Sequence, residues 1–248
     1  LLRKIEMDTS TPASLTQLYT LVPSHMREPY LVHLLHHPPC QKVEVRTDLS
    51  DVYRTHKPKL PREEAPAFPL SIIFVARCKS AELLSRMLTE LGIPNVSLHS
   101  MLPQSTRLHN LHMFRARRVP ILISTDVGSR GLDVPDVELV VNWDVPAAWE
   151  DYVHRVGRTA RKGRPGWAVS FVTEHDVELV QTIEDKIHKT LTEWDMPESQ
   201  VLERLSHVSA AKRVASMALH DEKFGEQRER NKRKAQASQP PSKKHHVQ

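Results

Sequence analysis

The sequence predicts an α/β protein built on a parallel sheet with helices on both faces. Between residues 71 and 191, short apolar runs alternate with longer segments that carry apolar residues at helical spacing. Such alternation is typical of parallel sheets, because each helical crossover returns the chain to the same end of the sheet. At 248 residues the chain is long enough for one well-buried domain with extensions.

The first predicted elements precede this regular part. Residues 17–22 are expected to form a strand. Ser24 is a candidate N-cap for the helix that follows, because its hydroxyl can accept a hydrogen bond from the first helical N–H groups. The apolar face of this helix is expected to consist of Tyr30, Leu31, Leu34 and Leu35.

Residues 36–69 interrupt the pattern. Six prolines fall in a charged stretch with little periodicity, which predicts a mobile insertion in the domain. The insertion could bind a partner or could simply be solvated, and the sequence leaves both interpretations open.

The regular part then follows with clear boundaries. Gly92 and Pro94 are expected to end a helix, as a C-terminal glycine and a following proline do. The predicted elements, in order, are strand 71–75, helix 80–91, strand 96–98, helix 103–114, strand 121–124, strand 137–141, helix 149–155, strand 168–172 and helix 176–191.

The C-terminal part differs in composition. Apolar residues between positions 199 and 224 predict one long helix, and residues 225–248 have the polar composition of a disordered tail. Residues 221–248 hold eight Lys or Arg and four Asp or Glu, so they carry +4 of the formal net charge of +5. The rest is nearly neutral, so it would have to bind polyanions through individually placed residues.

Some classes of site and location are disfavoured by composition. Cys40 and Cys78 have no paired spacing, which argues against a disulfide framework or a zinc site. His109 and His112 could share a metal ion on one helix, although such a pair is more often an ordinary surface feature. The chain shows no signal peptide and no apolar run of membrane-spanning length, so no membrane contact is expected.

The candidate chemistry lies in residues 154–161, which read His-Arg-Val-Gly-Arg-Thr-Ala-Arg. Three arginines and a histidine surround a glycine at the end of a predicted helix. Guanidinium groups are planar, permanently charged donors that can grip phosphate oxygens in pairs. A solvated basic loop would explain the segment equally well if it stood alone.

The neighbouring segments favour the phosphate-binding interpretation over the solvated loop. The apolar strand and polar loop at residues 121–133, and the run 137–141 with Asn-Trp-Asp after it, precede the basic segment at the right spacing. Together they resemble motifs V, Va and VI of the DEAD-box RNA helicases. Residues 71–75 resemble motif IV, and Gln104-x-x-Arg107 resembles motif IVa. His154 favours this family over related helicase and remodelling classes.

The resemblance implies a C-terminal RecA-like domain with defined boundaries. The chain contains no phosphate loop of the form G-x-x-x-x-G-K-[ST] and no Asp-Glu-Ala-Asp segment, both of which the first domain of this family carries. ATP with Mg²⁺ would therefore be bound mainly by that N-terminal RecA-like domain, and this chain alone should be inactive. The implied organisation is a linker at 1–14, the domain at 15–197, a helical extension at 198–224 and the tail at 225–248.

The resemblance also implies roles on the nucleotide side. Arg158 and Arg161 would be arginine fingers that reach ATP across the cleft, His154 would be the third catalytic residue, and Arg155 would join the fingers in binding ATP. His154 and Arg155 would also couple their loop to the first domain and brace it. An alternative for Arg155 is a structural ion pair with Asp126. Asp133 would accept the ribose hydroxyl of ATP, or it could simply cap a helix.

On the RNA side, the implied contacts are to the sugar-phosphate backbone, which positions RNA without specifying its sequence. Gln104, Arg107 and Thr125 would contact phosphates or 2′-hydroxyls, and the backbone N–H groups of Gly128 and Gly131 could approach closely. The chain departs from motif IV where Arg77 replaces an RNA-facing threonine, and from motif VI where Ala160 replaces the commoner glycine.

Ala160 and residues 17–24 resemble the nucleolar, ribosome-assembling branch of the family. This implies pre-ribosomal proteins as partners and a location in the nucleus and nucleolus. The basic cluster at 228–234 could direct nuclear entry or only solubilise the tail. The competing function is a non-catalytic RNA- or protein-binding module, against which the intact Arg158 and Arg161 argue.

Overall fold

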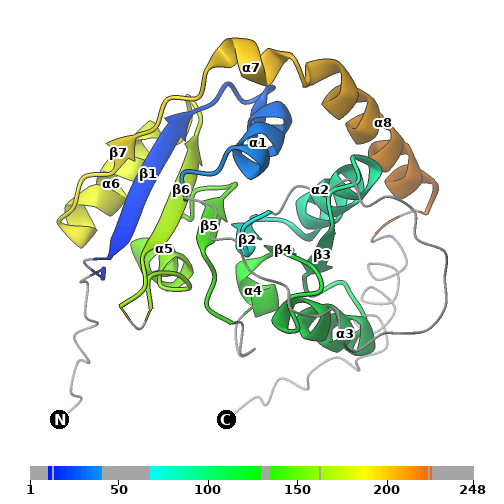
Figure 1. The fold of residues 1–248 in the computed structure, drawn as a ribbon, viewed down its shortest axis with the longest axis horizontal. Coiled ribbons are helices and arrows are strands. Elements are labelled where there is room, and N and C mark those ends of the chain that lie inside the picture. Colours follow the sequence, from blue (N-terminus) through cyan, green and yellow to red (C-terminus); the bar gives the residue numbers. More distant parts are fainter. Residues whose placement is uncertain are drawn as a thin grey trace, which may run out of the picture.

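The computed structural model describes residues 11–12, 14–40, 68–129, 135–161, 163–222 and 224. These residues form one seven-stranded sheet in the order β3-β4-β2-β5-β6-β1-β7, and all its neighbouring strands are parallel (Figure 1). The predicted fold class is therefore confirmed. The strands are β1 (Leu15–Leu21), β2 (Ser71–Phe74), β3 (Asn95–Leu98), β4 (Ile121–Ser124), β5 (Leu139–Asn142), β6 (Gly166–Val172) and β7 (Thr192–Glu193).

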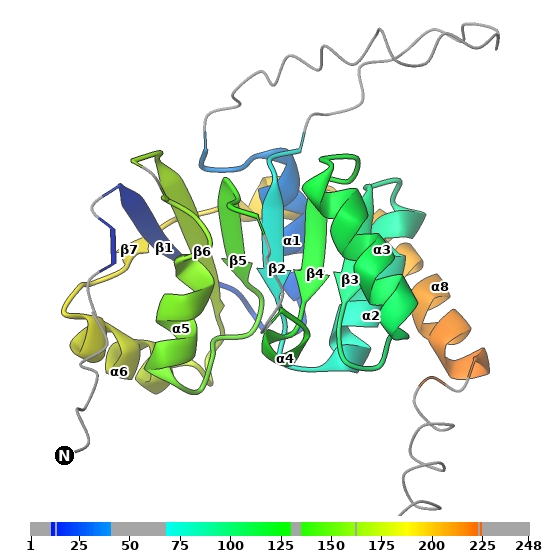
Figure 2. The same cartoon turned by 90° about the horizontal axis from the view of Figure 1, so that it is seen from below.

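Helices cover both faces of the sheet, as Figure 2 shows. One face carries α1 (Arg27–His36), α2 (Cys78–Glu90), α7 (Glu198–Leu202) and α8 (Leu205–Asp221). The opposite face carries α3 (Gln104–Arg115), α5 (Trp149–Val156) and α6 (Val177–Ile187). The single turn α4 (Asp126–Ser129) follows directly on β4. None of the described helices is long and apolar enough to cross a bilayer.

The central strands are apolar on both sides because they separate two hydrophobic cores. Successive side chains of a strand point to opposite faces. Accordingly Ile73, Ile123 and Val141 pack under α1, α2 and α8. Their neighbours on the other face pack under α3, α5 and α6, and these are Ile72, Leu122 and Val140. This double burial explains why the sequence shows short continuous apolar runs here and no apolar–polar alternation.

The register of the sheet gathers the predicted motifs. Phe74 at the end of β2 pairs with Ser124 of β4 on one side and with Asn142 of β5 on the other. Leu98 of β3 pairs with Ser124 in turn. Four strands therefore end level with one another, and the loops of motifs IV, IVa, V and Va leave from this carboxyl edge. Ligands of open parallel sheets bind at such an edge.

Two predicted boundaries were wrong. Ser24 does not cap α1, which begins only at Arg27; the Ser24 hydroxyl instead donates to Glu174 Oε1 at 3.0 Å. Helix α6 ends at Ile187 because His188 takes a left-handed conformation, with φ +51°. The chain then returns Leu191 to the core, where its N–H donates to Glu184 Oε1 at 2.6 Å.

The predicted C-terminal helix is two helices. The chain turns at Glu203 and Arg204, between α7 and α8. The two helices have different neighbours, because α7 contacts α1 whereas α8 packs mainly on α2. By contrast, Gly92 ends α2 as predicted, with φ +71°. Most of the predicted insertion, residues 41–67, and the tail, residues 225–248, lie outside the described residues.

Candidate functional site

Arg155 is the central side chain of the site. It lies in the last turn of α5 and is 3% exposed. Its Nε and Nη2 donate to the two carboxylate oxygens of Asp126, each at 2.7 Å. Its Nη1 donates to the Asp144 carbonyl at 2.6 Å and to Asn142 Oδ1 at 3.3 Å. The ion pair with Asp126 is thus present, and it joins motif V to motif VI.

These contacts leave the Arg155 guanidinium little capacity for the predicted contact with ATP. All three nitrogens of the guanidinium donate to acceptors within the protein, and the group also lies over the Phe74 ring at 5.2 Å. A guanidinium held in this way braces the loop and has little freedom to reach a nucleotide. The geometry therefore favours the bracing role over a direct contact with ATP.

The loop that follows α5 is anchored at the opposite end of the sheet. Thr159 is fully buried, and its hydroxyl donates to the Val137 carbonyl at 2.6 Å. The Val137 N–H donates to the Arg158 carbonyl at 3.0 Å. Because Val137 precedes β5, the loop lies beside the amino end of that strand. Helix α5 thus runs back along the sheet before the loop begins. The guanidinium of Arg155 still reaches the carboxyl edge, whereas the Arg158 backbone lies near the amino end of β5.

The three predicted catalytic residues differ in exposure. His154 is exposed on α5, and Arg158 is half-buried in the loop. Arg161 is 44% exposed, with Nη1 3.2 Å from Asp136 Oδ1 and Nε donating to the Gly157 carbonyl. An exposed ion pair of this kind is weak and can be exchanged for another anion. Asp133, predicted to bind the ribose, lies outside the described residues.

A close approach of backbones fixes the shape of the loop. Ala160 is buried and left-handed, with φ +57°, a conformation that suits glycine better. Ala160 therefore adopts a strained conformation at a position where the motif more commonly has glycine. A Cβ on Gly166, at the start of β6, would clash with the Ala160 backbone nitrogen and the Thr159 hydroxyl.

Gly166→Ala should therefore lower the free energy of unfolding by about 1–3 kcal/mol, the usual cost of overpacking. The clash involves backbone, which cannot move aside as a flexible side chain can. Urea unfolding of the chain measures the change. Gly92→Ala is a useful comparison, because its position is open and only the left-handed backbone opposes a side chain there. An unfolding free energy unchanged by Gly166→Ala would show that the loop is not fixed by this contact.

The predicted RNA-facing residues lie at the carboxyl edge. Gln104 begins α3 and is exposed, and Arg107 follows one turn later, with Nη1 donating to Gln104 Oε1 at 3.0 Å. Thr125 is buried directly after β4, and its N–H donates to the Leu98 carbonyl at 3.3 Å. Gly128 lies in α4, while Gly131 is outside the described residues. Arg77 is exposed at the same edge, directly before α2.

Comparisons with known proteins agree with this geometry. The helicase conserved C-terminal domain matches residues 64–163. ATP-dependent RNA helicase DBP8 of Mycosarcoma maydis is 54% identical over 257 residues, covering 93% of this chain and 48% of that protein. DBP8 of Saccharomyces cerevisiae (strain ATCC 204508 / S288c) is 42% identical, covering 92% and 47%.

Two solved structures are similar as well. E. coli DEAD-box protein SrmB, bound to regulator of ribonuclease activity A, has a TM-score of 0.59 and 30% identity over 74% of this chain and 92% of that one. S. cerevisiae Dbp5 bound to RNA and ADP BeF3 has a TM-score of 0.59 and 27% identity, covering 82% and 46%. The chain belongs to the DEAD-box family. It is a C-terminal helicase domain with a RecA-like fold, and it spans about half the length of the DBP8 relatives.

Within this DEAD-box domain, sequence reasoning missed a second link. The Asp144 carboxylate accepts Arg27 Nη2 at 2.9 Å on Oδ1 and the Ala76 N–H at 2.7 Å on Oδ2. Arg27 also lies 4.3 Å above the Trp143 ring. Since the Asp144 carbonyl accepts from Arg155, motifs IV, Va and VI are held together at one residue. Asp144 belongs to a quoted motif, but no sequence signal marks Arg27 as its partner.

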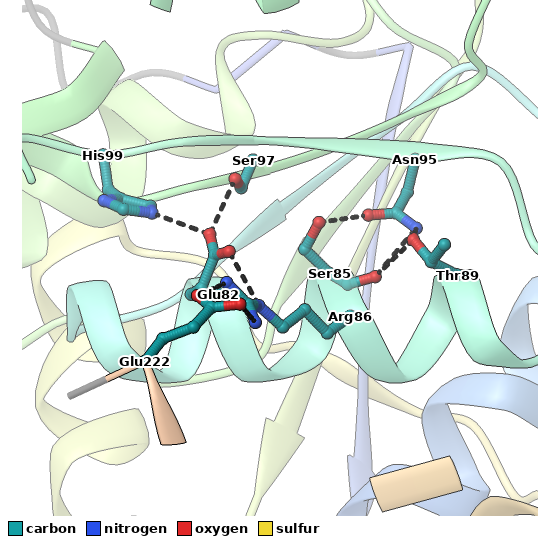
Figure 3. Close-up of polar contacts among 8 residues, drawn as sticks. All are labelled: Glu82, Ser85, Arg86, Thr89, Asn95, Ser97, His99 and Glu222. Carbon is teal, nitrogen blue, oxygen red and sulfur yellow. Dashed lines mark hydrogen bonds and ion pairs between the residues drawn. The ribbon is translucent and has the colours of Figure 1, made fainter. Parts of the chain in front are cut away.

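Glu82 of α2 forms another group of contacts, drawn in Figure 3. Its Oε2 accepts the Ser97 hydroxyl at 3.2 Å and His99 Nε2 at 3.3 Å, and its Oε1 accepts Arg86 Nε at 3.0 Å. The hydrogen bond from His99 is the main cause that lowers the pKa of Glu82 below its ordinary value of 4.5, with Arg86 adding to it against the effect of burial. In the described part of the chain, no group of three His, Cys, Asp or Glu residues could hold a metal ion.

The lowered pKa of Glu82 predicts a dependence of stability on acid. The folded state binds the Glu82 proton less tightly than the unfolded state, so the carboxylate stabilises the fold above about pH 4.5. That contribution is lost as the pH falls through the lower folded pKa. Glu82→Gln should thus flatten the unfolding free energy measured between about pH 5 and pH 3. Glu178→Gln, on the exposed side of α6, is the control, and an equal flattening in both variants would refute the assignment.

Proposed function

We propose that this chain is the second half of an ATP-dependent RNA helicase, in which it supplies arginine fingers and contacts to the RNA backbone. The observation that carries the proposal is the bidentate bond between Arg155 and Asp126. Asp126 follows Thr125 on the RNA side, and Arg155 begins the segment that leads to Arg158 and Arg161. A part-buried ion pair therefore joins the two proposed surfaces, which suits an enzyme whose chemistry is gated by domain closure.

On the nucleotide side, Arg158 and Arg161 would neutralise charge on the γ-phosphate of ATP held with Mg²⁺ by the N-terminal RecA-like domain. Arg161 would exchange its exposed pair with Asp136 for phosphate oxygens when the two domains close. His154, exposed one helical turn earlier, would contact the first domain. Asp133 would accept the ribose hydroxyl.

On the RNA side, Gln104, Arg107, Thr125 and the backbone of Gly128 and Gly131 would bind phosphates and 2′-hydroxyls. The similar Dbp5 structure holds RNA and ADP BeF3, which supports both surfaces. Contacts of this kind carry no base information, so RNAs of many sequences are expected as substrates.

The RNA contacts can be tested on this chain directly. Titration of a labelled single-stranded RNA at several salt concentrations should show weak, salt-sensitive binding. Arg107→Gln should lower the affinity for all sequences alike and reduce the salt slope by about one. Removal of residues 225–248 should flatten the slope further, because these residues carry most of the net charge. Tight binding that ignores salt, the tail and Arg107 would mean that the RNA is recognised in another way.

We also propose that the full protein acts in ribosome biogenesis, with pre-ribosomal proteins as partners, in the nucleus and nucleolus. Support comes from Ala160 and from the segment 17–24, which resemble that branch. The basic cluster at 228–234 would direct nuclear entry. A fluorescent reporter fused to residues 225–248 should accumulate in the nucleus, and even distribution through the cell would count against this role of the tail.

A further inference from the structure

Helix α8 packs against α2, and its end lies on the side of the sheet where β3 and β4 end, as Figure 2 shows. Its buried residues Val208, Ala211, Ala215 and Leu219 pack on the body of the domain. Two ion pairs hold it in place. Lys212 Nζ lies 2.6 Å from Glu28 Oε1 of α1, in the middle of α8. Arg86 of α2 makes the second pair, with Glu222 at the end of α8.

The pair between Arg86 and Glu222 has the more specific geometry, because it is bidentate. Arg86 Nη1 and Nη2 donate to the two oxygens of Glu222 at 2.8 and 2.6 Å, while Nε donates to Glu82 (Figure 3). One guanidinium thus ties the end of α8 to the carboxylate that holds β3. Paired hydrogen bonds of this kind fix the orientation of both carboxylates as well as their distance.

Glu82 passes this restraint to the end of β3. It accepts Ser97 and His99, and His99 is completely buried. The Phe224 ring, just beyond α8, meets the His99 ring edge to face with centroids 6.0 Å apart. The end of α8 therefore touches β3 both through charge and through an aromatic contact.

His99 begins the turn that leads to the proposed RNA contacts. Its carbonyl accepts the Leu102 N–H at 3.2 Å, and α3 begins two residues later at Gln104. Asn110 of α3 donates from Nδ2 to the Ser97 carbonyl at 2.8 Å, so α3 is also tied to β3. The contacts from Glu222 to the RNA-facing turn of motif IVa are continuous.

We infer that Glu222 and Arg86 are positioning residues for RNA binding, which act through Glu82 and His99 on the turn before Gln104. The helical extension then contributes to RNA binding. This inference rests on the proposed function, because it assigns a role to that RNA site. A general loss of stability would not explain an effect of Glu222 on RNA binding. The Glu222 side chain is 58% exposed in its pair with Arg86, and exposed pairs add little to folding.

Two matched substitutions separate positioning from simple docking of α8. Glu222→Gln loosens the pair with Arg86, and Glu28→Gln loosens the pair with Lys212. Each removes one negative charge, which by itself would strengthen binding to RNA. In the 248-residue chain, with a fluorescein-labelled oligouridylate as the probe, Glu222→Gln should weaken binding about twofold to fivefold, the most that a largely exposed pair can transmit. Glu28→Gln should leave the affinity the same or slightly higher, and Glu222→Asp should recover part of the loss.

Amide hydrogen exchange gives a second readout that needs no RNA. Exchange of residues 99–107 should be faster in Glu222→Gln and unchanged in Glu28→Gln. Equal weakening of RNA binding by both variants, or unchanged affinity in Glu222→Gln, would overturn the inference. If the unaltered chain does not bind the probe, the proposed RNA-binding function itself is wrong. Faster amide exchange in Glu222→Gln would then show only that Glu222 is coupled to residues 99–107, and the positioning role in RNA binding would be wrong as well.

Discussion

Arg158→Lys should reduce ATP hydrolysis about 10³- to 10⁵-fold in a protein that joins this chain to its first RecA-like domain. Lysine keeps the positive charge but lacks the planar fork that holds two phosphate oxygens at fixed angles. The Arg158 carbonyl accepts a hydrogen bond from the Val137 N–H. The backbone of Arg158 is therefore held in place next to the start of β5. Steady-state ATP turnover at saturating RNA measures the loss.

Arg164→Lys is the matched control, because Arg164 is an exposed arginine in the same loop. It should keep near-normal turnover. RNA binding without nucleotide should also be little affected by Arg158→Lys, since the proposed RNA contacts lie at the other end of the strands. If Arg158→Lys hydrolyses ATP at a normal rate, or loses RNA affinity and turnover in equal proportion, Arg158 is not a finger.

Arg155→Gln should destabilise this chain by about 2–4 kcal/mol, because it breaks a part-buried ion pair and leaves several acceptors without their donor. Asp126 would lose both its hydrogen bonds from Arg155, and the Asp144 carbonyl would lose one. Glutamine is too short to replace them together. Urea unfolding, followed by tryptophan fluorescence, gives the difference in free energy.

Arg161→Gln provides the contrast for this measurement. Its pair with Asp136 is largely exposed, and such pairs contribute about 0–1 kcal/mol. Comparable losses in the two variants would show that Arg155 is no more important to the fold than a surface arginine. Its role as the brace between motifs V and VI would then have to be abandoned.

The sheet could be predicted well because its signals are local. Doubly buried strands give short apolar runs such as residues 121–124, and Gly92 marks a helix end by its backbone freedom. The errors arose where tertiary contacts decide. Ser24 pairs with Glu174, 150 residues away, and so leaves the helix uncapped. His188 ends α6 in a left-handed conformation, and no glycine or proline marks this position in the sequence.

The candidate site shows the same division. Short motifs identified Arg155 and its partner Asp126, because both belong to segments with recognisable order and spacing. The placement of the motif VI loop at the amino end of β5 could not be predicted from that order, since it depends on the direction of α5. Arg27 and Asp144 are 117 residues apart, and Arg86 and Glu222 are 136 apart, so neither pair leaves a trace in a single sequence.

We propose that this chain completes, from across a cleft, an ATP site that it does not itself contain. The most direct test compares ATP hydrolysis, with and without RNA, by this chain, by the first RecA-like domain and by the two joined in one protein. We expect ATP turnover that is stimulated by RNA in the joined protein alone. Hydrolysis by this chain by itself, after rigorous exclusion of contaminating ATPases, or joined protein that turns over ATP at the same rate without RNA, would contradict it.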